Sequence, residues 1–182
     1  MRTASCCEAP ILTACVVLCV FCSSTSPASA AVVFSGEVSP AKSTDWNDTK
    51  HGYIGKTSGK SGSITVNGGS VLTSKSGDLG HASGAAGSVT VTGGGSTWTN
   101  TYGVVVGYSG TGTMRIENGG QVNNGDGNIA AGGAGASGTV TVTGIGSRWT
   151  NRYDLSLGYW GGRSTLRDDS RITSAFQFAE NL

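Results

Sequence analysis

A repeat of 51 residues constrains the fold more than any other feature of this sequence. The chain reads GSVTVTGGGSTWTNTYGVVVGYSGTGT at residues 87–113 and GTVTVTGIGSRWTNRYDLSLGYWGGRS at residues 138–164, and 15 of these 27 aligned positions are identical. Repeats of this length are typical of solenoids and propellers, in which each unit buries its apolar face against its neighbours. The sequence therefore indicates a repetitive architecture before it indicates any activity.

Apolar and polar residues alternate in several short runs of each unit. Val89 and Val91 form one such pair, and Met114 and Ile116 form another. A period of two is the pattern of a strand with one buried face. Residues 118–120, Asn-Gly-Gly, supply a turn after the second run, because asparagine and glycine tolerate left-handed backbone angles.

We predict an all-β fold, a parallel β-helix (solenoid) of about six coils. One coil takes about two dozen residues, so the 51-residue unit corresponds to about two coils. The expected organisation is a signal peptide at 1–30, a lead-in that caps the first coil at 31–44, the repeat domain at 45–174 and a tail at 175–182. A β-propeller and a β-sandwich are the competing folds, but a propeller needs about four blades to close.

Residues 1–30 have the features of a signal peptide. Arg2 supplies the positive end, residues 11–22 are uncharged, and Ala28-Ser29-Ala30 has the small-residue form of a cleavage site. We expect cleavage after Ala30, with lipid attachment at Cys15 as an alternative. All five cysteines lie in this segment, so the mature chain has no disulfide and depends on packing and hydrogen bonds.

The charge and composition of the chain exclude some functions. The formal net charge is +1 at pH 7, which gives no bulk attraction to nucleic acid or to anionic lipid. All 31 glycines follow residue 30, where Pro40 is the sole proline. Frequent glycine with regular valine pairs favours short strands joined by tight turns over a disordered linker.

Tryptophan recurs once in each unit. Trp46, Trp98 and Trp149 each stand nine residues before a glycine. We predict that they stack along the solenoid as packed aromatic side chains, because a residue repeated in step with the architecture is most simply explained by packing. The alternative is a row of exposed rings that bind the faces of sugars.

The motifs GTVTVTGIGSRWTN, DLSLGYWG, GYSGTGTMRIENGGQV and GNIAAGGAGASG carry a family resemblance. Over about residues 46–174, the chain resembles the repeat of type V secretion (autotransporter) passengers and of some PEP-CTERM-associated exported proteins. The resemblance implies a β-helical stalk that is secreted or held at the cell surface, at the outer membrane of a Gram-negative bacterium. It implies adhesion and no catalytic residues.

We therefore expect an exported, non-enzymatic structural or adhesive protein. A surface glycan, or a host or matrix component, is the expected partner, and nucleic acid is not; outer-membrane association and oligomeric state stay open. Residues 167–182 show neither a membrane barrel nor a PEP-CTERM signal, so a non-functional remnant of a larger autotransporter is one alternative. The other is a polysaccharide-active enzyme on the same scaffold that uses Asp154, Asp168 and Asp169.

The last repeat supplies the candidate binding residues. At the 51-residue spacing, Arg163, Thr165 and Arg167 take the places of Gly112, Met114 and Ile116, and residues 168–170 replace the Asn-Gly-Gly turn. The candidate surface combines two aromatic and three basic side chains of this repeat: Tyr159, Trp160, Arg163, Arg167 and Arg171.

No cofactor or metal site is expected. His51 and His81 are the only histidines, and neither has a second recurring ligand beside it. Residues 133–138, GAGASG, match the dinucleotide-binding glycine pattern, but no helix is predicted after them, so we interpret them as a turn.

Overall fold

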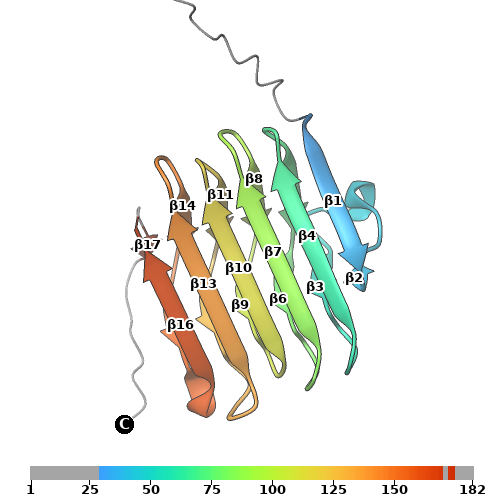
Figure 1. Cartoon of the computed structure of the whole chain (residues 1–182), viewed down its shortest axis with the longest axis vertical. Coiled ribbons are helices and arrows are strands. Elements are labelled where there is room, and N and C mark those ends of the chain that lie inside the picture. The colour runs from blue at the N-terminus through green and yellow to red at the C-terminus, as the bar shows by residue number, and fades with distance from the viewer. Residues whose placement is uncertain (1–28, 170–171, 175–182) are drawn as a thin grey trace, which may run out of the picture.

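Three sheets run along the molecule, and adjacent strands of each sheet come from successive coils of the chain (Figure 1). The computed structural model describes residues 29–169 and 172–174. Sheet A contains β1 (Ala31–Gly36), β4 (Ser61–Asn67), β7 (Ala86–Thr92), β10 (Thr111–Glu117), β13 (Ser137–Thr143) and β16 (Arg163–Asp168). Sheet C contains β5 (Val71–Ser74), β8 (Thr97–Asn100), β11 (Gln121–Asn124), β14 (Arg148–Asn151) and β17 (Ile172–Ser174). Sheet B contains β2 (Val38–Ser39), β3 (His51–Ile54), β6 (Ser76–Leu79), β9 (Val104–Val106), β12 (Gly127–Ile129) and β15 (Leu155–Leu157).

The chain passes through sheets A, C and B in turn, so the predicted parallel β-helix is confirmed. Gly87 pairs with Gly112, and Gly112 pairs with Gly138, in parallel register. These two coils take 25 and 26 residues and together give the 51-residue unit. Sheet A contains five parallel strands, β4, β7, β10, β13 and β16, so the solenoid has about five coils and the predicted six was too many.

The alternating residues line the inside of the solenoid. In sheet A, Ile64, Val89 and Met114 lie in register on adjacent strands and are buried. Valine and isoleucine suit this position because their branched side chains pack well on a pleated surface. The same stacking of apolar side chains in sheets B and C makes one continuous core along the molecule.

The tryptophans lie in this core, as predicted, but they do not stack on one another. Trp98 and Trp149 are fully buried in sheet C, and Val122 lies between them on β11. Each ring instead crosses to a glycine of sheet B. A Cβ atom at Gly77 would overlap the Trp98 ring, and one at Gly127 would lie 2.8 Å from Cζ2 of Trp149. From β6 to β15, coils that carry glycine in sheet B therefore alternate with coils that carry tryptophan in sheet C, whereas Trp46 packs on Gly52 in the N-terminal segment.

A buried polar column in sheet C satisfies the indole groups. The indole N–H of Trp149 donates a hydrogen bond to Oδ1 of Asn124 at 2.7 Å, and that of Trp98 donates to Oγ of Ser74 at 3.1 Å. Asn124 also donates through Nδ2 to Oδ1 of Asn151 at 2.5 Å. Buried polar groups need such partners, because an unpaired one costs about 1 to 3 kcal/mol.

Asn124→Ala is expected to lower the free energy of unfolding by about 2 kcal/mol, because it leaves the buried Trp149 indole N–H without its acceptor. Denaturant unfolding followed by circular dichroism measures this loss. Asn123 precedes it on β11 and points outward, so Asn123→Ala should change the same quantity by less than about 0.5 kcal/mol. Equal effects of the two changes would contradict the role given to Asn124.

The N-terminal segment covers the first coil in the opposite strand direction. β1 pairs antiparallel with β4, and β2 pairs antiparallel with β3. Trp46 follows the short 3₁₀ helix η1 (Ser43–Asp45), packs its ring 5.5 Å from that of Phe34 and donates its indole N–H to the carbonyl of Pro40 at 2.7 Å. Two sheet edges and the open end of the core are thereby occupied, which limits pairing with other chains.

The last repeat is displaced by one residue from the alignment that the sequence suggests. Gly138 pairs with Ser164 and Val140 with Leu166, so Leu166, not Thr165, continues the core column of Met114. The prediction was wrong because the corner after β15 is one residue longer than the corner after β9. The 3₁₀ helix η2 (Tyr159–Gly161) takes up the extra residue. Arg163 and Arg167 consequently lie on outward positions, and Asp168 pairs with Val142.

Candidate binding surface

The structure brings together part of the predicted patch in the last repeat. Tyr159 and Trp160 lie in η2 with ring centroids 5.0 Å apart, and Trp160 is 69% exposed. Arg163 and Arg167 are exposed on the outer face of β16. They are four positions apart along the strand, a distance of about 13 Å, so they do not form one cluster. Arg171 lies outside the described residues.

The three aspartates of the enzyme alternative do not converge. Asp154 lies before β15, at the corner between sheets C and B, and its backbone N–H donates to Oδ1 of Asp126 at 3.3 Å. Asp169 follows β16 at the corner between sheets A and C. Asp168 ends β16 in register with the buried Val142. The groove that this alternative requires is therefore absent from the described part of the chain.

A row of rings on three successive coils forms a surface that the sequence analysis missed. This aromatic row consists of Tyr53, His81 and Tyr108. The rings of Tyr53 and His81 meet edge to face at 5.1 Å, and those of His81 and Tyr108 stack at 5.0 Å with an 11° angle between planes. Lys56 places its ammonium 4.6 Å from the centre of the Tyr53 ring, a favourable cation–π contact.

The strand register explains why these rings meet. His81 and Tyr108 each follow a glycine with positive φ, Gly80 and Gly107, at the corner after a sheet B strand. The backbone N–H of Ser109 donates to the carbonyl of His81 at 3.2 Å, which aligns the two corners. Adjacent coils are about 4.8 Å apart, so side chains that leave equivalent corners stack. The shared Gly-aromatic dipeptide was the available sequence signal.

One carboxylate lies beside this row. Asp78 on β6 places Oδ2 at 3.1 Å from Nδ1 of His81, and its side chain is mostly buried. Burial raises the pKa of the Asp78 carboxyl above its usual value, and the nearby His81 and His51 only partly oppose this effect. The row therefore contains a histidine and an acid in contact, at the edge of the exposed rings.

Asp78→Asn is expected to raise the free energy of unfolding at pH 7, because asparagine avoids the cost of burying a charge. The pKa of Asp78 is higher in the folded than in the unfolded chain, so this group's contribution to stability is present at low pH. It is lost as the pH rises through the folded pKa. The gain in free energy of unfolding from Asp78→Asn should therefore be smaller at pH 4 than at pH 7, and denaturant unfolding at both pH values would measure it.

The exposed Asp48 provides a matched control for this pH dependence. Its side chain lies on the surface of the loop that follows η1, so Asp48→Asn should give the same small difference at both pH values. If Asp78→Asn behaves like this control, the burial of Asp78 has no role in the pH dependence of stability.

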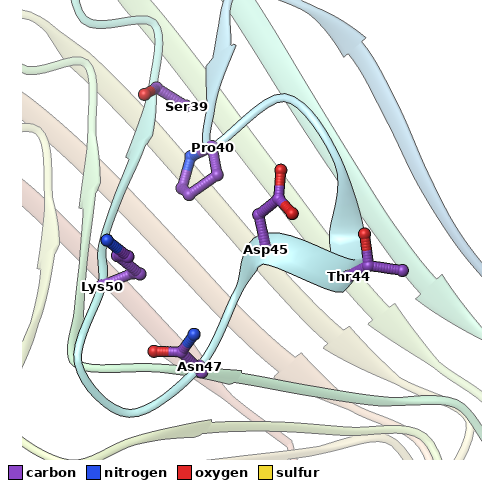
Figure 2. A pocket seen from close by; sticks show the side chains of 6 residues that line it. All are labelled: Ser39, Pro40, Thr44, Asp45, Asn47 and Lys50. Carbon is purple, nitrogen blue, oxygen red and sulfur yellow. The ribbon is translucent and has the colours of Figure 1, made fainter.

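A hollow of about 520 Å³ lies at the N-terminal end, beside η1 (Figure 2). Its lining is mainly polar: Ser39, Pro40, Thr44, Asp45, Asn47 and Lys50 (Figure 2). It contains no aromatic ring and belongs to the segment that covers the first coil. The aromatic row is the better candidate for binding, because it offers both apolar faces and polar groups.

No group of three or more histidine, cysteine, aspartate or glutamate side chains within residues 29–169 and 172–174 is placed to hold a metal ion. No helix in this same part of the chain is long and apolar enough to cross a membrane.

Comparisons with protein-family models, with curated proteins and with solved structures find no match for this chain.

Proposed function

We propose that the protein is an exported, non-enzymatic β-solenoid that acts as a structural and adhesive rod outside the inner membrane. One observation carries this proposal: exposed aromatic side chains lie in line on the outside of a rigid core. Tyr108 and Tyr159 are both 42% exposed at equivalent corners of different coils. Exposed aromatic rings on a soluble scaffold are typical of binding surfaces.

The fold also suits an extended scaffold. Each coil contacts mainly its neighbours, so the molecule presents the same outward positions repeatedly along one axis. The outer positions of sheet A include many hydroxyl side chains, such as Ser63, Ser88 and Thr113, which are in register. The resemblance to autotransporter passengers supports a location at the surface of a Gram-negative cell.

Fractionation of cells that produce the full chain tests the proposal. The protein should be found in the medium or the outer-membrane fraction, and its intact mass should correspond to a chain that begins at Ala31. Retention in the cytoplasm with residues 1–30 still attached would overturn the proposed export. Confinement to the periplasm, without binding to any surface polysaccharide, would favour a remnant of a larger protein.

The adhesive part of the proposal has its own measurement. Cells that display the protein should adhere to polysaccharide-coated surfaces more strongly than cells that lack it. Equal adhesion of the two strains would leave a structural role and remove the adhesive one.

A further inference from the structure

The column of rings at the corner after sheet B is interrupted at one coil. The residues that follow the corner glycine, or its equivalent Ala130, are Lys56, His81, Tyr108, Ala131 and Tyr159, in coil order. Backbone hydrogen bonds fix this order: the N–H of His81 donates to the carbonyl of Gly55 at 2.9 Å, and that of Ala131 donates to Gly107 at 3.1 Å. Ala131 therefore takes a position that carries a ring on the coils before and after it.

The rings that are present show how this column packs. His81 and Tyr108 lie on adjacent coils, and their nearly parallel rings are 5.0 Å apart, close to the spacing of the coils. One face of the Tyr108 ring stacks on the ring of His81. On its other side, the next coil has only the methyl group of Ala131 at the equivalent position. Tyr159, two coils beyond Tyr108, lies about 9.5 Å along the axis.

The floor of this gap is backbone. A Cβ atom on Gly132 would overlap the carbonyl oxygen of Tyr108, so the two backbones are in close contact. On the far side, the carbonyl oxygen of Trp160 lies 3.8 Å from the position that a Cβ atom on Gly133 would take. The backbone of Trp160 therefore lies beside Gly133, its ring contacts that of Tyr159, and residues 131–133 carry no side chain larger than a methyl group.

The dimensions and polarity of the gap specify its occupant. A ring held between two aromatic rings makes two van der Waals contacts of about 3.5 to 4 Å each, so the flanking rings must be about 7 to 8 Å apart. The spacing of about 9.5 Å therefore accepts one ring. A puckered ring, which is thicker, fits better than a flat one. The outer side is open to water. The flanking residues offer polar groups: Tyr108 and Tyr159 are partly exposed and each carries a phenol hydroxyl, and the Ser109 hydroxyl lies 2.8 Å from the position that a Cβ atom on Gly132 would take. A ligand with apolar faces and a hydroxylated edge matches both features.

We propose that this gap binds one pyranose ring of a polysaccharide, with Tyr108 on one face of the sugar and the Tyr159–Trp160 pair on the other. The proposal rests on the adhesive function proposed above and names its ligand class and its site. Apolar contact with the rings provides affinity, and the hydroxyls at the rim select a sugar over a hydrocarbon. A pyranose held face to face between these rings has its glycosidic bonds in the ring plane, so neighbouring sugars of the same polysaccharide run across the solenoid axis and not along it.

Calorimetric titration of the purified, exported protein with soluble cellohexaose and chitohexaose tests the proposal. At least one hexasaccharide should bind, and Tyr108→Ala should weaken it at least tenfold. Ala131→Tyr should also weaken hexasaccharide binding at least tenfold, because the new ring would occupy the gap. Tyr102→Ala serves as the control, because Tyr102 is an exposed ring at the corner between β8 and β9, outside the aromatic row and the gap; the affinity of this variant should match that of the unchanged protein.

Thermal unfolding separates loss of the site from loss of the fold. Ala131→Tyr should not lower the melting temperature, because its ring stacks on Tyr108 without entering the core. Unchanged hexasaccharide affinity in this folded variant would overturn the proposal. The proposal would also be overturned if the unchanged protein did not bind either hexasaccharide at millimolar concentration. Binding of indole without binding of either hexasaccharide would overturn it as well. Export and cell adhesion are measured separately, so the function proposed above can survive each of these results.

Discussion

Gly112→Ala should lower the free energy of unfolding by about 3 kcal/mol or more, a large part of the 5 to 15 kcal/mol that stabilises a typical domain. Gly112 points inward on β10, where a Cβ atom would overlap the backbone nitrogen of Gly107 and lie 2.6 Å from the carbonyl carbon of Val106. Both obstacles are backbone atoms, one in the last residue of β9 and one in the first residue of the corner that follows, so no side chain can rotate away. Urea unfolding and the yield of folded protein would measure the loss.

Gly94 is the matched control for this substitution. It lies in the turn between β7 and β8 with no positive φ, and a Cβ atom there would have nothing within 4 Å. Gly94→Ala should therefore change stability by less than about 0.5 kcal/mol or increase it slightly. If Gly112→Ala were as mild as this control, the close approach of the two backbone segments would not be a constraint on the fold.

The second large effect concerns Trp98 and Gly77, which are expected to be strongly coupled. Gly77→Val should cost about 3 kcal/mol because its side chain would enter the space of the Trp98 ring. Trp98→Val should cost about 4 kcal/mol through the cavity that it leaves. The double variant should be about 2 kcal/mol more stable than the sum of the single effects predicts, since the valine at position 77 fills part of that cavity.

A second pair of substitutions checks that this coupling is local. Trp149 packs on Gly127, two strands away from Gly77 in sheet B. Gly77→Val combined with Trp149→Val should therefore give additive losses in denaturant unfolding. Additivity in the Trp98 pair as well would mean that Gly77 is not the complement of the Trp98 ring.

The fold was predictable from the sequence because repetition and alternation are local signals. The pairs Val89/Val91 and Met114/Ile116 identify the strands, and the 51-residue spacing identifies the stacking. The register of the last coil was not predictable in the same way. A corner of the solenoid can gain one residue, as in η2, without disturbing the strands beside it, so equal spacing in sequence does not guarantee equal position.

The packing of the tryptophans was only half predictable. Their recurrence indicates burial, which is confirmed for Trp46, Trp98 and Trp149. It does not reveal that one repeat contains two coils of different cross-section, so the contact of Trp98 with Gly77 on the preceding coil was missed. That contact depends on which residues face each other across the interior, and this information comes only from three-dimensional register.

Only the part of the candidate binding surface that Tyr159 and Trp160 form was predictable from the sequence. Tyr159 and Trp160 are adjacent in sequence, and their proximity was evident. His81 and Tyr108 are 27 residues apart and belong to corners of different length, so their stacking required knowledge of the coil register. Arg163 and Arg167 do not contribute to one common binding site, because they are four positions apart on the same strand.

The alternation of coils that carry tryptophan with coils that carry glycine also restricts which duplications within the gene preserve the packing of the core. Duplication of a single coil would place two tryptophans, or two glycines, on neighbouring levels; the neighbouring glycines Gly52 and Gly77 are tolerated because Trp46 of the N-terminal segment covers Gly52, and a coil duplicated inside the solenoid would have no such cover. Duplication of two coils preserves the partner of every ring. Lineages of this protein should therefore differ in length by steps of about 51 residues, and DNA encoding half of that step should be lost soon after it arises.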